Sequence, residues 1–272
     1  MTRETDCGPA RGGPALEPRR GSVAEKLGIS LSHRHVFIAF VVVLFGAIVG
    51  LSVIFVGLGI LVTHVLERGT IGVWDHQASI WFSVHGHSPW NGLTGDVTLV
   101  ADTFEVAGVA GVFTIVLLVR HFGRQSFVIA TSLAIELSVF LIANTIVKRP
   151  RPHVRHLGGT PSTYSFPSGH TAATAALYGG LAVIVCVVTS RRGLRILAWT
   201  IAVLLTIAVG FSRVYRGDHY VTDVVAGALL GSASVWSAVF IIRIIRAKPG
   251  SQISSLNPEH ATVASPSEGA SP

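Results

Sequence analysis

Residues 36 to 65 form a long apolar run, VFIAFVVVLFGAIVGLSVIFVGLGILVTHV, that contains no Asp, Glu, Lys or Arg. A helix needs about 20 predominantly apolar residues to cross the hydrocarbon core of a bilayer, so this run is long enough to span a membrane. It follows a long hydrophilic segment, which favours an uncleaved anchor over a secretory signal. Half of the 272 residues are hydrophobic and only 13% are charged, a composition that excludes an ordinary water-soluble domain.

The rest of the chain continues this pattern, and it predicts an all-α fold. Five further apolar runs are each expected to form a transmembrane helix, near residues 104–120, 126–147, 171–190, 195–215 and 221–245. The stretch VWDHQASIWFSV (73–84) predicts an amphipathic helix lying along the membrane interface. We therefore expect a polytopic bundle of six transmembrane helices over residues 35–247. The polar segments 1–34 and 248–272 lack periodicity and are expected to be disordered tails.

The distribution of positive charge predicts how the bundle is oriented. The net charge of +7 could suggest nucleic acid, but Lys and Arg gather between the apolar runs and form no stripe on an amphipathic element, so no nucleic-acid binding is expected. Fourteen of the 21 Lys and Arg residues lie in the two tails and in two connections on one side of the membrane. The positive-inside rule then places both termini in the cytoplasm, and we expect a multi-pass protein of the plasma (inner) membrane.

Six of the other seven basic residues crowd into two short segments on the opposite, extracytoplasmic side. These are NTIVKRPRPHVRH (144–156) and SRVYRGDHYVTD (212–223). Because this side should be poor in positive charge, the concentration predicts an anionic ligand.

A third segment, YSFPSGHTAATAAL (164–177), lies between the spans that carry the first two. Its proline and glycine favour a sharp turn before a helix that starts near Thr171, and the first N–H groups of a helix have no partner within it. Such a helix end binds anions. Ser168 adds a hydroxyl and His170 an imidazole, so the segment predicts a phosphate cradle.

The segment 212–223 supplies groups suited to phosphoryl transfer. His219 and Asp223 are four residues apart, which places them on one face if a helix starts there. A carboxylate bonded to one ring nitrogen leaves the other nitrogen free as a nucleophile or base. Arg151 and Arg213 carry planar guanidinium groups that match phosphate oxygens. Two imidazoles, two guanidinium groups and a helix end can transfer a phosphoryl group without a metal.

The three segments together resemble the signature of the type-2 phosphatidic acid phosphatase superfamily, which includes integral-membrane lipid phosphatases and is related to the vanadium haloperoxidases. That signature is Lys, six residues, Arg-Pro; then Pro-Ser-Gly-His; then Ser-Arg, five residues, His, three residues, Asp. The second and third motifs are complete, at Pro167–His170 and Ser212–Asp223. The first has Arg151-Pro152, but Asn144 stands where the family has lysine. Lys148, one helical turn nearer the loop, is a candidate replacement for that charge.

The resemblance implies a two-step hydrolysis without metal or cofactor. His219 would attack the phosphorus while Asp223 orients its ring, and His170 would protonate the departing oxygen and then activate water. The implied phosphate-binding residues are Arg151, Arg213, Ser168 and Gly169, with Lys148 and Asn144 at and near the position of the family's lysine.

Three functions remain open at this point. The first is hydrolysis of a lipid phosphate or diphosphate, such as undecaprenyl diphosphate, phosphatidate or phosphatidylglycerol phosphate, at the extracytoplasmic face. The second is transfer of the same phosphoryl group to a sugar or lipid acceptor. The third, made conceivable by Asn144, is a catalytically silent lipid-binding or transport protein. The sequence predicts neither the particular lipid nor an oligomeric state.

One further residue has two open interpretations. Glu136 lies midway along the run 126–147, where a charged side chain costs roughly 3 kcal/mol to insert. It is either hydrogen-bonded within the bundle or part of a polar path with Asn144, two turns away on the same face.

Overall fold

The structure is a computed structural model that describes residues 16, 18–19, 21–31, 36–99, 102–120, 123–159 and 162–246. Within these ranges the regular elements are helices, and no strand occurs. The all-α prediction is confirmed. The elements are α1 (Val23–Leu31), α2 (Val36–His64), the 3₁₀ turn η2 (Leu66–Arg68), α3 (Thr70–His85), α4 (Trp90–Leu99), α5 (Thr103–Val119), α6 (Gly123–Val147), α7 (Gly169–Val188), α8 (Arg192–Tyr215) and α9 (Val221–Arg246).

Most of the long helices, α2, α6, α7 and α9, show little separation of polar and apolar faces, as expected for helices whose solvent is lipid, whereas α8 is amphipathic. Five of them, α2, α6, α7, α8 and α9, are long and apolar enough to cross a membrane. Helix α5 lies where a sixth span is expected, but it has only 17 residues, or about 25 Å at roughly 1.5 Å per residue. The chain is thus a multi-pass membrane protein whose described helices include five of full spanning length.

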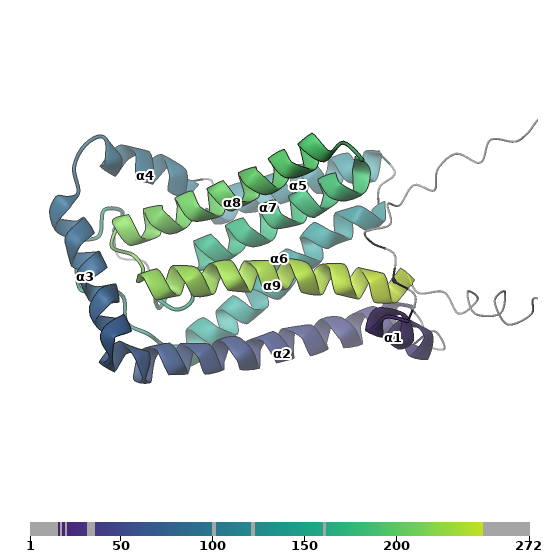
Figure 1. Cartoon of the computed structure of the whole chain (residues 1–272), viewed down its shortest axis with the longest axis horizontal. Coiled ribbons are helices and arrows are strands. Elements are labelled where there is room, and N and C mark those ends of the chain that lie inside the picture. The colour runs from purple at the N-terminus through teal and green to yellow at the C-terminus, as the bar shows by residue number, and fades with distance from the viewer. Residues whose placement is uncertain are drawn as a thin grey trace, which may run out of the picture.

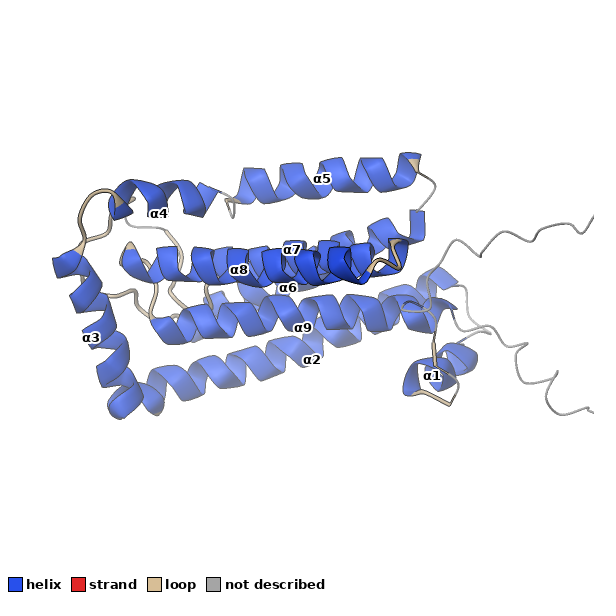
Figure 2. Ribbon diagram, turned by 45° about the horizontal axis from the view of Figure 1, so that its top comes forward, coloured by secondary structure: helices blue, strands red, loops and turns tan. Residues whose placement is uncertain are grey.

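Helices α7 and α9 form the centre of the bundle, with α6 and α8 packed beside them (Figure 1, Figure 2). Two glycines of α9 allow its close approach to α7. A side chain at Gly227 would collide with the carbonyl oxygen of Ser168, and one at Gly231 with that of Ala172. Small residues are the usual means of close helix packing in membranes. This contact fixes the start of α7 against the first turns of α9.

Helix α3 crosses one end of the bundle, at the opposite end from α1 and the last turns of α9 (Figure 1). The helix predicted over residues 73–84 is therefore present. Its buried residues are Gly72, Asp75 and Ser79, whereas Trp74 and Trp81 are exposed. Helix α3 thus turns small and polar side chains toward the protein and its tryptophans outward. Its position at a membrane interface stays a prediction.

The terminal segments differ from expectation in one place. Residues 23–31, within the segment expected to be disordered, form helix α1, which contacts α9. Ala24 of α1 is buried, and this packing compensates for the conformational entropy lost when a short helix orders. Residues 1–15 and 247–272 lie outside the described residues.

Candidate active site

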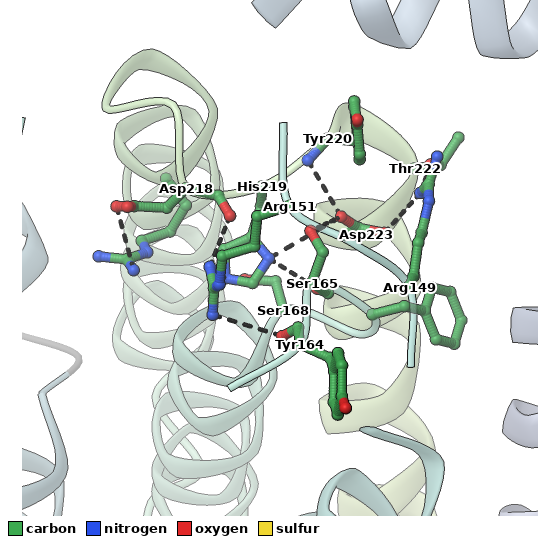
Figure 3. Close-up of polar contacts among 12 residues, drawn as sticks. Arg149, Arg151, Tyr164, Ser165, Ser168, Asp218, His219, Tyr220, Thr222 and Asp223 are labelled. Carbon is green, nitrogen blue, oxygen red and sulfur yellow. Dashed lines mark hydrogen bonds and ion pairs between the residues drawn. The ribbon is translucent and has the colours of Figure 1, made fainter. Parts of the chain in front are cut away.

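The three sequence segments meet at the end of the bundle that α3 covers (Figure 1, Figure 3). The first follows α6, the second opens α7, and the third joins α8 to α9. They border a cavity of about 390 Å³. Five of the residues predicted to form the site line it, namely Arg151, Gly169, His170, Arg213 and His219. The fold therefore brings the main predicted groups around one space.

Helix α7 begins at this cavity without a capping side chain. Ser168 is its N-cap residue, and its side chain makes no capping hydrogen bond to the first turn. The Ser168 hydroxyl pairs with the Thr171 hydroxyl at 3.0 Å, and the Ser168 N–H donates to the carbonyl of Asp223 at 3.0 Å. At Gly169 a side chain would meet the ring of Phe140 at 3.0 Å. The N–H groups at this end suit an anion, and the Ser168 hydroxyl keeps capacity for a further bond, because its contact with Thr171 occupies only one of its hydrogen-bonding positions.

The ring of His219 is held by a backbone carbonyl. Its Nδ1 lies 2.7 Å from the carbonyl oxygen of Ser165, and because a carbonyl only accepts, Nδ1 carries the proton and Nε2 has the free lone pair. Nη1 of Arg151 lies 3.3 Å from that Nε2. Burial lowers the pKa of His219, which keeps the imidazole neutral near pH 7. The arrangement is that of a neutral, oriented nucleophile or base.

Asp223 does not bond the histidine directly, which differs from the expected His-Asp pair. Its Oδ2 is 3.9 Å from Nδ1 of His219, too far for a hydrogen bond. It accepts instead from the Ser165 hydroxyl at 2.5 Å and from the Tyr220 N–H at 3.0 Å. The carboxylate thus orients the ring through Ser165, whose hydroxyl it holds while the carbonyl of the same residue holds the imidazole (Figure 3).

Arg149 also belongs to this site, although the sequence predicted for it only a contribution to the positive charge of the segment 144–156. It is 1% exposed, and its Nη1 and Nη2 lie 2.6 Å from Asp223 and 3.1 Å from Asp75. Its guanidinium carbon also lies 4.3 Å from the ring centre of Tyr220, a cation-π contact. Burial opposes its charge, but Asp223 and Asp75 raise the pKa of the Arg149 guanidinium above its ordinary value. Arg149 therefore fastens the carboxylate of Asp223 to helix α3.

The two predicted phosphate-binding arginines are both anchored by the loops around them. Arg151 donates to the carbonyl of Asp218 at 2.5 Å and to that of Thr163 at 2.8 Å. Arg213 pairs with the Asp218 carboxylate at 3.1 Å, and its buried Nε has no hydrogen-bond partner within the described residues. Asp218 thus positions both guanidinium groups, a role that the sequence motif did not predict. The unpaired Nε–H of Arg213 is available to an anion in the cavity.

Asn144 and Lys148 do not line the cavity. The Asn144 amide donates to the carbonyls of Tyr164 and Phe166 at 2.9 and 3.0 Å and accepts from the Tyr164 N–H at 3.2 Å. Lys148 is exposed, at the end of α6. The Asn144 side chain thus stabilises the backbone of the loop before α7. It does not face the cavity, where the expected contact with phosphate would require it.

His170 completes the polar end of the cavity. Its side chain is 29% exposed, and its Nε2 lies 4.0 Å from the carboxylate of Asp102. Within the described residues, no group of three or more His, Cys, Asp or Glu side chains could hold a metal ion. The cavity end is formed mainly by nitrogen groups from Arg151, His170, Arg213 and His219, a set that suits a tetrahedral oxyanion.

Comparison with known proteins agrees with this geometry. The PAP2 superfamily model matches residues 125–247, which include all three segments. The chain is 33% identical over 134 residues to an undecaprenyl-diphosphatase of Sulfolobus acidocaldarius, covering 48% of this chain and 57% of that protein. It is 32% identical over 156 residues to a decaprenylphosphoryl-5-phosphoribose phosphatase of Mycolicibacterium smegmatis, covering 48% of this chain and 80% of that protein.

A solved structure shares the fold. The PAP2-type phosphatidylglycerolphosphate phosphatase from Bacillus subtilis superimposes with a TM-score of 0.61 and 20% identity, over 70% of this chain and 93% of that one. The match to the first relative spans less than two thirds of its length, whereas the match to the mycobacterial protein covers most of it. The resemblance read from the motifs is therefore confirmed, and this chain belongs to the PAP2 superfamily.

Proposed function

We propose that this chain is a membrane phosphatase that hydrolyses a lipid phosphate or diphosphate through a phosphohistidine on His219. One observation carries the proposal: His219, His170, Arg151 and Arg213 line the same cavity at the start of α7. A nucleophile, an acid and several positive groups around one space are what metal-free phosphoryl transfer requires.

The first step is attack on phosphorus. The lone pair of His219 Nε2 forms a bond to the terminal phosphorus, and the bond from that phosphorus to the ester oxygen breaks. The leaving oxygen is that of the lipid alcohol in a monophosphate, and the bridging oxygen of the departing lipid monophosphate in a diphosphate. In the complex with the anionic substrate His170 carries the proton, and it gives that proton to the oxygen as it leaves. The ring of His219 stays in place because its Nδ1–H is bonded to the carbonyl of Ser165.

The second step is hydrolysis of the phosphohistidine. His170, now neutral, takes a proton from a water molecule whose oxygen attacks phosphorus, and the bond from phosphorus to Nε2 of His219 breaks. Inorganic phosphate leaves, and both imidazoles return to their starting forms. Arg151, Arg213 and the Gly169 N–H hold the nonbridging oxygens in both steps, with each charge-assisted bond contributing roughly 1.5 to 3 kcal/mol.

The proposed substrate class follows from the other wall of the cavity. Side chains of α5, α6 and α7, including Val106, Leu133 and Ala173, continue the cavity from the polar end into the bundle. Such a wall suits an apolar chain beside the phosphate. The relatives are named for undecaprenyl diphosphate and decaprenylphosphoryl-5-phosphoribose, both lipids, which supports a lipid substrate here. The positive-inside pattern supports an active site on the extracytoplasmic face.

The experiment measures release of inorganic phosphate from a panel of lipid phosphates by the purified protein in detergent, with EDTA present. We expect turnover in wild type, inhibition by vanadate and no turnover in His219→Ala. The matched control is His153→Ala, which removes an exposed histidine of the neighbouring loop and should leave activity intact. Labelled substrate should leave an acid-labile, alkali-stable phosphoryl group on wild type.

Three outcomes would contradict parts of the proposal. Full activity in His219→Ala would refute the nucleophile. Loss of activity in EDTA would refute metal-free chemistry. Label passing to an added sugar or lipid acceptor with no release of phosphate would identify a phosphotransferase.

A further inference from the structure

The cavity contains one polar group that the proposed reaction does not use. Glu136 of α6 lines it in the midst of an apolar wall. The side chain is 4% exposed, and no hydrogen bond or ion pair joins it to any other described residue. Buried polar groups in native proteins are nearly always paired, so an unpaired carboxyl on a cavity wall indicates that its partner is a ligand. The apolar residues around it are Val106, Ala107, Leu133, Leu137, Phe140 and Ala173.

The position of Glu136 along α6 determines which part of a substrate it meets. Glu136 and Phe140 lie on one face of the helix, and the Phe140 ring packs against Gly169 at the proposed phosphate position. Glu136 is one turn, about 6 Å, further from the C-terminal end of α6, which places it deeper in the bundle. A separation of about 6 Å spans only a few covalent bonds. Glu136 would therefore lie beside the alcohol part of a bound phosphate ester and not beside the distant end of a lipid tail.

The chemistry of a carboxyl in an apolar wall narrows the kind of group it recognises. A hydroxyl can pair with a carboxyl in either protonation state, because it both donates and accepts. A second phosphate offers mainly acceptors, so it pairs only with the protonated carboxyl, through that group's single O–H, and is repelled by the ionised form. An ammonium group requires the ionised form, which such an environment strongly disfavours. A hydroxyl is therefore the best match.

We infer that Glu136 is a specificity-determining residue that hydrogen-bonds a hydroxyl on the alcohol part of the substrate. The preferred substrates are then phosphate esters whose glycerol or sugar alcohol keeps a free hydroxyl close to the phosphate, and polyprenyl diphosphates are poorer ones. This inference rests on the proposed function and adds the substrate class to it.

The experiment compares two substrates that differ only in the hydroxyl: 1-acyl-glycerol 3-phosphate and its 2-deoxy analogue with the same acyl chain. One neutral hydrogen bond predicts a kcat/KM in wild type that is up to about tenfold higher for the hydroxylated ester. In Glu136→Leu the ratio should fall to about one through loss on the hydroxylated ester alone. Glu136→Gln keeps a hydrogen-bonding group and should retain much of the preference. Leu133→Ala alters the same wall without touching a polar group and should leave the ratio unchanged.

Several results would overturn the inference. These are equal turnover of the two esters by wild type, an equal loss on both esters in Glu136→Leu and Glu136→Gln, or faster hydrolysis of farnesyl diphosphate than of the hydroxylated ester. Binding of both esters is measured in parallel by calorimetry on detergent-purified protein. If neither ester is hydrolysed but a binding preference exists and disappears in Glu136→Leu, the proposed function fails and the assignment of Glu136 stands. If neither a binding nor a kinetic preference exists, the assignment fails.

Discussion

Replacing Arg149 by methionine tests whether the carboxylate of Asp223 is held from helix α3. The arginine is 1% exposed, and Asp75 and Asp223, at 3% and 0%, are its partners. Its removal leaves two buried carboxylates without their cation, and breaking such a buried pair from one side costs about 3 to 5 kcal/mol. We therefore expect a large loss of thermal stability. Activity should fall about tenfold or more, because each 1.36 kcal/mol of lost transition-state stabilisation is tenfold in rate and Asp223 positions His219 through Ser165.

The assay combines thermal unfolding in detergent with kcat/KM for phosphate release at a temperature where the variant is folded. Arg155→Met is the matched control, since Arg155 is exposed in the same loop and should tolerate the change. Arg149→Lys is expected to recover only part of the loss, because an ammonium group cannot reproduce the two-armed contact with both carboxylates. If Arg149→Met unfolds and turns over substrate like Arg155→Met, the proposed link from α3 to Asp223 is refuted.

Two other predictions concern His219 and Asn144. Because burial lowers the pKa of His219, its neutral form persists below the ordinary value of about 6.5. The acid limb of kcat/KM that reports this group should then lie below that pH, and a limb above it would contradict the assignment. The same shift means that the unfolded chain binds more protons at acid pH. Stability should therefore fall as the pH drops below about 6.5, and less so in His219→Gln, as acid unfolding curves would show. Asn144→Lys restores the lysine of the family pattern but removes the amide that bonds the backbone of Tyr164 and Phe166. The variant should therefore have lower thermal stability and lower kcat, with a KM that does not fall. A lower KM would show that position 144 faces the phosphate.

Much of the fold could be predicted from composition and periodicity alone. The helices α2, α6, α8 and α9 begin and end within a few residues of the expected runs, because in lipid a helix is the structure in which a single segment pairs its own backbone groups. Helix α5 (Thr103–Val119) likewise matches the expected run 104–120 to within one residue at each end. The formation of α1 was harder to predict, because it depends on packing against α9, for which a polar segment contains no periodic signal.

The site was predictable where a motif fixes a local conformation and less so where contacts cross the fold. Gly169 and His170 lie at the start of a helix that their own sequence predicts. Arg149 and Arg151 both precede proline, and only the three-dimensional contacts show that the first meets carboxylates while the second lines the cavity. Asp75 lies more than 70 residues upstream of either arginine. The sequence predicted only an interfacial helix there, and no pattern in it indicated that Asp75 would contact Arg149.

The Asp75 to Arg149 contact also limits how small a working version of this protein can be. The family model covers residues 125–247. That portion includes all three motifs but not Asp75 of α3, whose carboxylate pairs with the buried guanidinium of Arg149. A fragment limited to the matched residues would lack one of the two carboxylates that pair with the buried Arg149. The other carboxylate is that of Asp223, which orients His219 through Ser165. The stable unit of this chain therefore extends upstream of the matched residues 125–247 to helix α3, which supplies Asp75.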